Sequence, residues 1–243
     1  RRGGRRRRCR RKDARPGMTA GAAPDRATDP ARTIFFGSGA FAVPILDALV
    51  ALPWATVVGV ITAPPRPAGR SAAPARTPVA QRATALGLPL LTPARVRDPE
   101  AVTGISALRP ELGVLADYGQ IVPAALLQLP PKGILNVHPS LLPRHRGATP
   151  IPATIAAGDE QAGVTMFRMD ESVDTGPIIA ATSWHLDGTE TAPALEADAA
   201  EADGSREKVV EDAHDEHQRV HQHHVEQAEQ DGRAPAHRKT HAH

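Results

Sequence analysis

Short apolar runs rich in β-branched residues alternate with segments of helical periodicity between residues 33 and 186. The run 33–37 (TIFFG) ends in glycine, which is typical of a buried parallel strand that enters a tight turn. Segment 41–52 has apolar residues at helical spacing, and 55–62 (ATVVGVIT) is a second β-branched run. Strand, helix and strand in this order predict a βαβ unit with a right-handed crossover.

The same alternation continues along the chain. Helices are expected at 77–86 and 99–108, and further strands at 89–91, 112–116, 133–137, 164–169 and 178–186. This order predicts an α/β fold, namely a Rossmann-like, mostly parallel twisted sheet with flanking helices. Ligands of such folds bind at the carboxyl ends of the strands. Residues 64–76 are rich in Pro, Gly and Arg and are expected to form a loop, whereas 191–200 is a poor candidate for the helix that should follow the last strand.

The two ends differ from this central region. Residues 1–15 are almost entirely basic, whereas the chain from residue 198 onward is acidic and holds eight of the eleven histidines. We therefore predict a disordered basic extension at 1–31, a folded domain at 32–197 and a disordered tail at 198–243. The first methionine is Met18, and one hypothesis is that residues 1–17 are not part of the natural protein.

Composition excludes several classes of protein. One cysteine, Cys9, rules out an internal disulfide framework and fits a reducing cytoplasm. No apolar run reaches the ~18 residues of a transmembrane helix, and no apolar segment follows the basic start to complete a signal peptide. A cytoplasmic protein without a membrane partner is expected. The histidines of the tail would bind metals only loosely in a disordered segment, so no metal site is expected.

Three side chains are the candidates for chemistry. Asn136 and His138 lie two apart in a predicted strand, so both point to the same face, and Asp174 lies in a turn closed by Gly176. An amide donates to a developing oxyanion, an imidazole moves protons and a carboxylate orients the imidazole. This set fits acyl transfer without a covalent nucleophile. The spacing alone leaves open a structural role for the histidine.

Two motifs in the sequence resemble those of a known protein family. NVHPSLLPRHRGATPI at 136–151, followed by MDESVDTG at 169–176, resembles the folate-dependent formyltransferases, and the resemblance covers roughly residues 32 to 194. It implies that 10-formyltetrahydrofolate is the co-substrate, that no metal is needed, and that Asn136, His138 and Asp174 are the catalytic residues. It also implies contacts with the folate from Leu115, Ala116, Asp117, Tyr118, Ser140, Leu141, Leu142, Pro143, Val173, Thr175 and Gly176.

Within the family, the resemblance is closest to the enzymes that formylate methionyl-tRNA. Segments 34–37, 41–44 and 66–70 are similar to the opening strand, the first helix and the start of the tRNA-contacting loop of those enzymes. Initiator methionyl-tRNA is therefore the implied acceptor, and a monomer is expected. The residues implied to contact tRNA are Arg66, Arg70, Arg144 and Arg146.

Some features depart from the family pattern. His145 stands where an aromatic ring is usual, and Asp117 stands where a small residue is common. The tail from 198 cannot build the OB-type barrel of the tRNA enzymes, and a frameshift in the gene is one hypothesis for its composition. Three alternatives stay open: a formyltransferase for a ribonucleotide or sugar nucleotide, an inactive remnant that binds folate or RNA, and an RNA-binding module driven by the N-terminal arginines.

Overall fold

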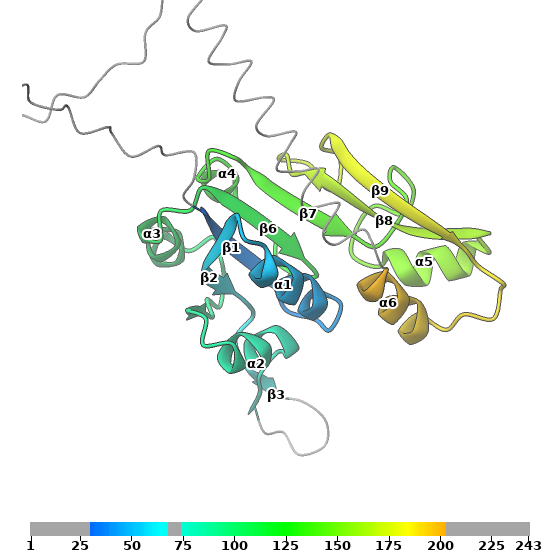
Figure 1. Cartoon of the computed structure of the whole chain (residues 1–243), viewed down its shortest axis with the longest axis horizontal. Helices are drawn as coiled ribbons and strands as arrows, with labels where there is room; N and C mark the ends of the chain where they lie inside the picture. Colours follow the sequence, from blue (N-terminus) through cyan, green and yellow to red (C-terminus); the bar gives the residue numbers. More distant parts are fainter. Residues whose placement is uncertain (1–29, 68–73, 203–243) are drawn as a thin grey trace, which may run out of the picture.

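A computed structural model describes residues 30–67 and 74–202 of the chain. Seven strands form one twisted sheet in the order β5-β2-β1-β6-β7-β8-β9, and β3 and β4 form a separate two-stranded pair (Figure 1). The strands are β1 (Ala31–Gly37), β2 (Ala55–Ile61), β3 (Arg66–Pro67), β4 (Pro74–Ala75), β5 (Leu90–Leu91), β6 (Leu112–Ala116), β7 (Ile134–His138), β8 (Gln161–Arg168) and β9 (Ile178–His185). The first five strands in the sheet order are parallel, and β8 and β9 are antiparallel to their neighbours.

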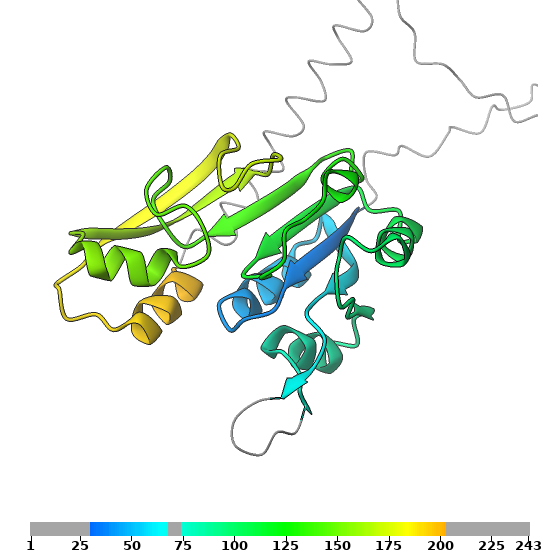
Figure 2. The same ribbon diagram turned by 180° about the vertical axis from the view of Figure 1, so that it is seen from behind.

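In the described part of the chain, six helices cover the two faces of the sheet (Figure 2). They are α1 (Ala42–Ala51), α2 (Pro78–Ala85), α3 (Pro99–Ala107), α4 (Ala124–Leu127), α5 (Pro150–Ala157) and α6 (Ala192–Glu201). Buried residues of α1, α2, α5 and α6 share one apolar core with the sheet, whereas Ile105 of α3 and Leu126 of α4 belong to the core on the opposite face. Strands β6 and β7 are buried along their whole length, which explains why β6 is a continuous apolar run, and β7 departs from this only at Asn136 and His138.

The predicted α/β class and the mostly parallel sheet are confirmed, and the expected strands and helices match to within a few residues. The expectation that 191–200 is a poor candidate for a helix was wrong. Segment 191–200 forms helix α6, in which Thr191 caps the amino end by accepting a hydrogen bond from the backbone N–H of Ala194, and Leu195 is fully buried. The predicted domain boundary at 197/198 therefore falls inside a helix.

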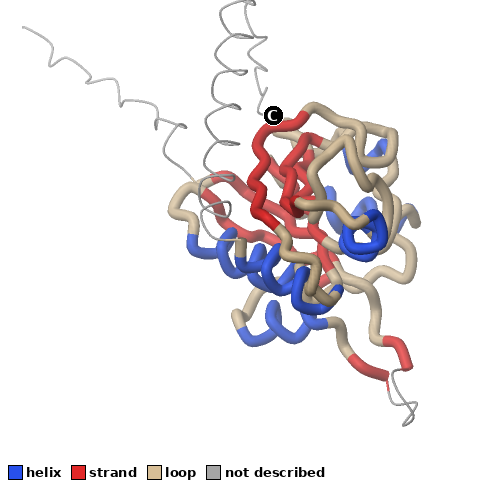
Figure 3. Tube along the Cα trace, turned by 90° about the vertical axis from the view of Figure 1, so that its right-hand side faces the viewer, coloured by secondary structure: helices blue, strands red, loops and turns tan. Residues whose placement is uncertain are grey.

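Three other features were not anticipated from the sequence. The short helix α4 was not predicted, and neither was α5, although Pro150 at the first position of α5 and Gly158 after its end are typical helix signals. The stretch expected to be a loop at 64–76 contains the short antiparallel pair β3–β4 (Figure 3). Residues 1–29, 68–73 and 203–243, with Cys9, Arg70 and the histidines of the tail, lie outside the described residues.

The strand order places a ligand-binding edge between β1 and β6. The chain runs outward from β1 through β2 to β5, then returns to the other side of β1 with β6 and β7. Loops that leave the carboxyl ends of β1 and β6 therefore diverge, and a ligand-binding crevice is expected at that edge of the sheet. No helix in the part of the chain that the structure describes is long and apolar enough to cross a membrane.

Candidate active site

A pocket of about 520 Å³ opens at this edge of the sheet. Its walls come from the carboxyl ends of β6 and β7, the loops after β7 and β8, and the amino-terminal half of α6. The lining residues include Phe41, Leu115, Asp117, Tyr118, Ile121, Val122, Asn136, His138, Gly147, Ile151, Met169, Asp170, Glu171, Val173, Asp174, Ala192 and Glu196. The pocket lies where an open parallel sheet is expected to bind its ligand.

Asn136 and His138 lie on the same face of β7, as their spacing predicts. Both side chains are almost buried, with 7% of Asn136 and 6% of His138 exposed, yet both line the pocket. The antiparallel pairing of β7 with β8 fixes their register, because Asn136 lies opposite Phe167 and His138 lies opposite Thr165. A rigid central strand therefore presents the amide and the imidazole side by side.

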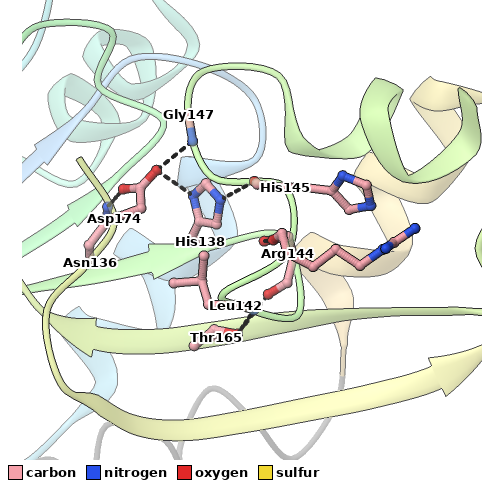
Figure 4. A network of polar contacts seen from close by, with 9 residues as sticks. Asn136, His138, Leu142, Arg144, His145, Gly147, Thr165 and Asp174 are labelled. Atoms are coloured by element: carbon pink, nitrogen blue, oxygen red, sulfur yellow. Dashed lines mark hydrogen bonds and ion pairs between the residues drawn. The ribbon is translucent and has the colours of Figure 1, made fainter. Parts of the chain in front are cut away.

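Asp174 joins these two side chains from the loop between β8 and β9. One carboxylate oxygen, Oδ1, accepts a hydrogen bond from Asn136 Nδ2 at 3.4 Å, and the other, Oδ2, accepts one from the backbone N–H of Gly147 at 2.8 Å. The same Oδ2 lies 3.8 Å from His138 Nδ1 (Figure 4). The structure thus brings together the three residues that the sequence singled out.

The imidazole of His138 is fixed on its other side by a backbone carbonyl. His138 Nε2 lies 3.0 Å from the oxygen of His145, and because a carbonyl can only accept, Nε2 must carry a hydrogen (Figure 4). The ring also meets Phe167 edge-on, with 6.5 Å between centroids. Nδ1, the nitrogen that faces Asp174, is therefore the one left to exchange a proton.

Backbone conformation shows how tightly this region is constrained. Among the described residues, four that are not glycine have positive φ, and three of them are Asp117, His145 and Asp174. Left-handed backbone costs energy in such residues, and it persists where surrounding contacts enforce it, commonly at functional sites.

The loop that carries Asp174 depends on a glycine. A Cβ on Gly176 would lie 1.7 Å from the carbonyl oxygen of Arg168, so no side chain fits there without moving the backbone. The same loop is closed by hydrogen bonds from the Thr175 hydroxyl and the Ser172 N–H to Asp170. The predicted turn at Asp174 is therefore set by close backbone approach as well as by local hydrogen bonds.

Gly176→Ala is expected to lower the free energy of unfolding by about 1–3 kcal/mol, because the added methyl group collides with the Arg168 carbonyl. Urea unfolding measures the change. Gly104→Ala in α3 is the matched control, since its Cβ approaches nothing closer than 3.7 Å and alanine in a helix interior is expected to stabilise by about 0.5–1 kcal/mol. Equal stability of the Gly176→Ala variant and the wild type would contradict the expectation.

The residues predicted to contact folate divide into two groups. Leu115, Asp117, Tyr118 and Val173 line the pocket, whereas Ala116, Thr175 and Gly176 are chain neighbours that do not. The segment predicted from Ser140 to Pro143 also lies outside the lining: Ser140 donates to the carbonyl of Arg144, and the N–H of Leu142 donates to Thr165. This segment instead builds the loop that returns to His138.

The predicted tRNA-contacting arginines that the structure describes lie on separate elements. Arg66 is exposed on β3, and Arg146 is exposed in the loop that leads to α5. Arg144 is engaged by Asp159 through an ion pair, and Arg70 is not among the described residues. The tRNA-binding role of these four residues stays a prediction.

Sequence reasoning missed Glu196, which lines the pocket from α6. Burial of the Asp117 carboxyl, and to a smaller extent the negative charge of Glu196, raise the pKa of Asp117 above the usual value of an aspartate. The Asp117 carboxylate also covers Gly39, where a Cβ would meet its Oδ2. Glu196 could not be assigned to the pocket from the sequence because the helix that carries it, α6, was not expected.

Asp117→Asn is expected to stabilise the folded chain at neutral pH. A carboxyl whose pKa is higher in the folded than in the unfolded state costs stability above the unfolded pKa, and this cost disappears as the pH falls below that value. Because part of the side chain meets solvent, the expected rise in Tm at pH 7 is only about 1–3 °C. Thermal unfolding at pH 7 and pH 3 checks this: a lower Tm for the variant at pH 7 would contradict it.

The pocket has an apolar mouth, of which Val173 was predicted from the sequence and Ile121 was not. Ile121 is 86% exposed and Val173 is 62% exposed, and both line the pocket. Large apolar side chains exposed at a concave site commonly contact a ligand. Among residues 30–67 and 74–202, no group of three or more His, Cys, Asp or Glu side chains is placed to hold a metal ion.

Comparison with known proteins shows which family this chain resembles. Residues 31–210 match the model of the formyl transferase family. A methionyl-tRNA formyltransferase of Roseiflexus sp. (strain RS-1) is 51% identical over 151 residues, which cover 62% of this chain and 46% of that protein. One from Thermus thermophilus is 46% identical over 149 residues, 61% of this chain and 48% of that protein. The chain thus spans about half the length of the curated relatives it matches.

Solved structures show the same fold. A phosphoribosylglycinamide formyltransferase from Bacillus halodurans superposes with a TM-score of 0.61 and 27% identity, over 75% of this chain and 92% of that chain. A glycinamide ribonucleotide transformylase from Geobacillus kaustophilus gives a TM-score of 0.60 at 25% identity, over 76% and 96%. From its sheet, its site and this match over most of its length, the chain belongs to the formyl transferase family.

Proposed function

We propose that this chain transfers a formyl group from 10-formyltetrahydrofolate to the amino group of methionine on initiator methionyl-tRNA. The observation that carries the proposal is the meeting of the Asn136 amide, the His138 imidazole and the Asp174 carboxylate in the wall of one pocket. These groups suit attack by an amine on a formyl carbon, because that reaction creates an oxyanion, which an amide can stabilise, and moves a proton, which an imidazole can carry.

The pocket has the size and lining that a folate donor requires. Small-molecule sites are commonly about 300–1,000 Å³, mostly apolar, with a few polar groups that fix orientation. Leu115, Tyr118 and Val122 provide apolar surface inside, and Ile121 and Val173 provide it at the mouth. A flat heteroaromatic ring system with a hydrogen-bonding edge fits this combination. The folate would be a co-substrate here.

The proposed reaction is direct transfer. The amine nitrogen forms a bond to the formyl carbon while the carbonyl electron pair moves to oxygen, and a second N–H of Asn136 and Nδ1–H of protonated His138 stabilise that oxyanion. The oxyanion then collapses, and the bond between the carbon and N10 of the folate breaks. His138 gives its Nδ1 proton to N10 and recovers one from the attacking amine, so no proton is gained or lost overall. Asp174 stabilises the imidazolium before this proton is given up and after one is recovered.

Initiator methionyl-tRNA is the acceptor that the sequence relatives favour. Curated relatives about 50% identical to this chain carry the name methionyl-tRNA formyltransferase, although they match over only half of their own length. The exposed Arg66 and Arg146 supply positive charge that contacts phosphates irrespective of sequence. Action as a monomer in the cytoplasm, on this tRNA and this folate, belongs to the same proposal.

A second acceptor is favoured by a different observation. The phosphoribosylglycinamide formyltransferase and the glycinamide ribonucleotide transformylase compared above match over 92% and 96% of their own length. Their fold is therefore nearly complete within this chain, which supports a small amine such as glycinamide ribonucleotide as the alternative substrate.

The two acceptors are distinguished by one assay. The 243-residue chain is incubated with 10-formyltetrahydrofolate and either methionyl-initiator tRNA or glycinamide ribonucleotide, and the formylated amine is quantified after release. We expect N-formylmethionine at a rate at least ten times that of the formylated ribonucleotide. A faster reaction with the ribonucleotide would reassign the acceptor, and the absence of both products would refute formyl transfer by this chain.

A further inference from the structure

The loop between β7 and α5 leaves the catalytic strand and returns to it. The chain departs immediately after His138, and seven residues later the carbonyl of His145 lies 3.0 Å from His138 Nε2. Two residues further, the N–H of Gly147 donates to Asp174 Oδ2 at 2.8 Å. One short loop therefore fixes both His138 and Asp174, so its own position must be well determined (Figure 4).

A single carboxylate holds this loop from outside the pocket. Asp159 Oδ2 lies 2.6 Å from His145 Nε2 and accepts from Arg144 Nε at 2.8 Å, while its Oδ1 accepts from Arg144 Nη2. Asp159 thus engages the side chains of two consecutive residues of the loop. We call Arg144, His145 and Asp159 the clamp. Asp159 does not line the pocket.

The position of Asp159 is itself fixed by secondary structure. It follows Gly158, whose left-handed backbone ends α5, and its N–H donates to the carbonyl of Thr154 in that helix. Only 13% of its side chain is exposed. Hydrogen bonds from Arg144 and then His145 lower the pKa of Asp159 to about 2, so the carboxylate that forms the clamp is lost only as the pH falls through that value.

The clamp also explains an unfavourable backbone. His145 has φ of 55°, which is uncommon for a residue with a β-carbon. This conformation directs the carbonyl to His138 while the imidazole of His145 points the other way, to Asp159. Among the described residues, Asp159 is the hydrogen-bond partner of the His145 imidazole, so its loss would release the side chain that holds this conformation.

We propose that Asp159 is a positioning residue for the formyl transfer reaction. It acts through the His145 carbonyl to keep the hydrogen of His138 on Nε2, and so to reserve Nδ1 for the substrate. This inference rests on the proposed function for its kinetic consequence, whereas the effect on the His138 ring exists without any substrate.

The test compares Asp159→Asn with Asp47→Asn. The first variant keeps the shape of Asp159 but removes its charge and puts an NH₂ group against at least one of the groups that donate to it. The second breaks an ion pair of the same type, between Arg82 and Asp47 on α2 and α1, that makes no contact with the loop. Asp159→Glu, which keeps the charge, is the conservative variant.

Asp159→Asn is expected to lower kcat about 10- to 100-fold, since a displacement of about 1 Å near reacting groups can cost about 100-fold. KM for the folate should stay within about threefold. Asp47→Asn should keep wild-type kcat, and Asp159→Glu should recover part of the loss. Long-range ¹H–¹⁵N spectra of the His138 ring, recorded without substrate, should show a hydrogen on Nε2 in the wild type and a mixture of tautomers in Asp159→Asn.

The proposal is overturned if Asp159→Asn keeps kcat within twofold of the wild type, or if it loses activity while the His138 ring spectrum is unchanged. An equal loss in Asp47→Asn would also overturn it, because the effect would then be general. If Asp159→Asn does not fold, His145→Ala removes the imidazole side of the clamp and must give the same ring signature. An inactive wild type would refute the proposed function and leave the ring spectra to decide on the clamp.

Discussion

His138→Ala should lower kcat for formyl transfer about 10³-fold. General acid–base catalysis by a positioned side chain is commonly worth about 10²–10⁴-fold, and His138 has the only imidazole among the residues that line the pocket. The substitution removes both the donor that faces the developing oxyanion and the group that carries the proton to N10. Steady-state kinetics with saturating folate measures the loss directly.

His185→Ala is the matched control for this variant. His185 is exposed on β9 and does not line the pocket, so its removal should leave kcat unchanged. Binding of a folate analogue by His138→Ala should stay within about threefold of the wild type, which separates lost chemistry from lost binding. If His138→Ala kept more than a tenth of the wild-type kcat, the histidine would not be the proton carrier.

Asn136→Ala is expected to lower kcat about 10²-fold with a small change in KM. Loss of one donor to an oxyanion commonly costs about 10²–10³-fold, because the donor is needed most in the transition state. Asn136 also donates to Asp174 at 3.4 Å, so the variant removes one of the contacts that hold the carboxylate. The kinetic loss should therefore appear in kcat and kcat/KM together.

Asn136→Asp separates the role of the donor from the role of the side-chain shape. The carboxylate is isosteric with the amide but cannot donate, and it brings a second negative charge beside Asp174. Activity at or below that of Asn136→Ala is expected. Activity nearer that of the wild type would show that the N–H groups of Asn136 do not stabilise the oxyanion, and the proposed mechanism would lose its main electrostatic contribution.

The central elements of the fold were predictable because burial on both faces leaves a direct mark on the sequence. Strand β6 is apolar throughout, and its bounds agree residue by residue with the expected 112–116, whereas β7 is interrupted only by Asn136 and His138. Helix α6 was not predictable in this way: its alanines and acidic residues form no broad apolar stripe, and essentially one large side chain, Leu195, anchors it in the core. Helix α6 is therefore stabilised by tertiary packing, which the local sequence pattern does not reveal.

The candidate site likewise contains residues that local sequence pattern predicts and residues whose roles depend on tertiary contacts. Asn136 and His138 were accessible to sequence reasoning because a strand has a period of two, and Asp174 because its glycine marks a turn. The placement of the 140–143 segment was less accessible, since its role in the loop depends on hydrogen bonds to Thr165 and Arg144. Asp159 was assigned no role from the sequence, because its importance arises from contacts with two residues that lie fourteen and fifteen positions earlier.

The most direct test of the account follows the formyl group itself. The wild-type chain and His138→Ala are each mixed with 10-formyltetrahydrofolate labelled in the formyl carbon and with methionyl-initiator tRNA, under single-turnover conditions. The account predicts label on the methionine nitrogen with the wild type and at least a hundredfold slower appearance with the variant. Equal rates for the two proteins, or label that never leaves the folate with the wild type, would contradict it.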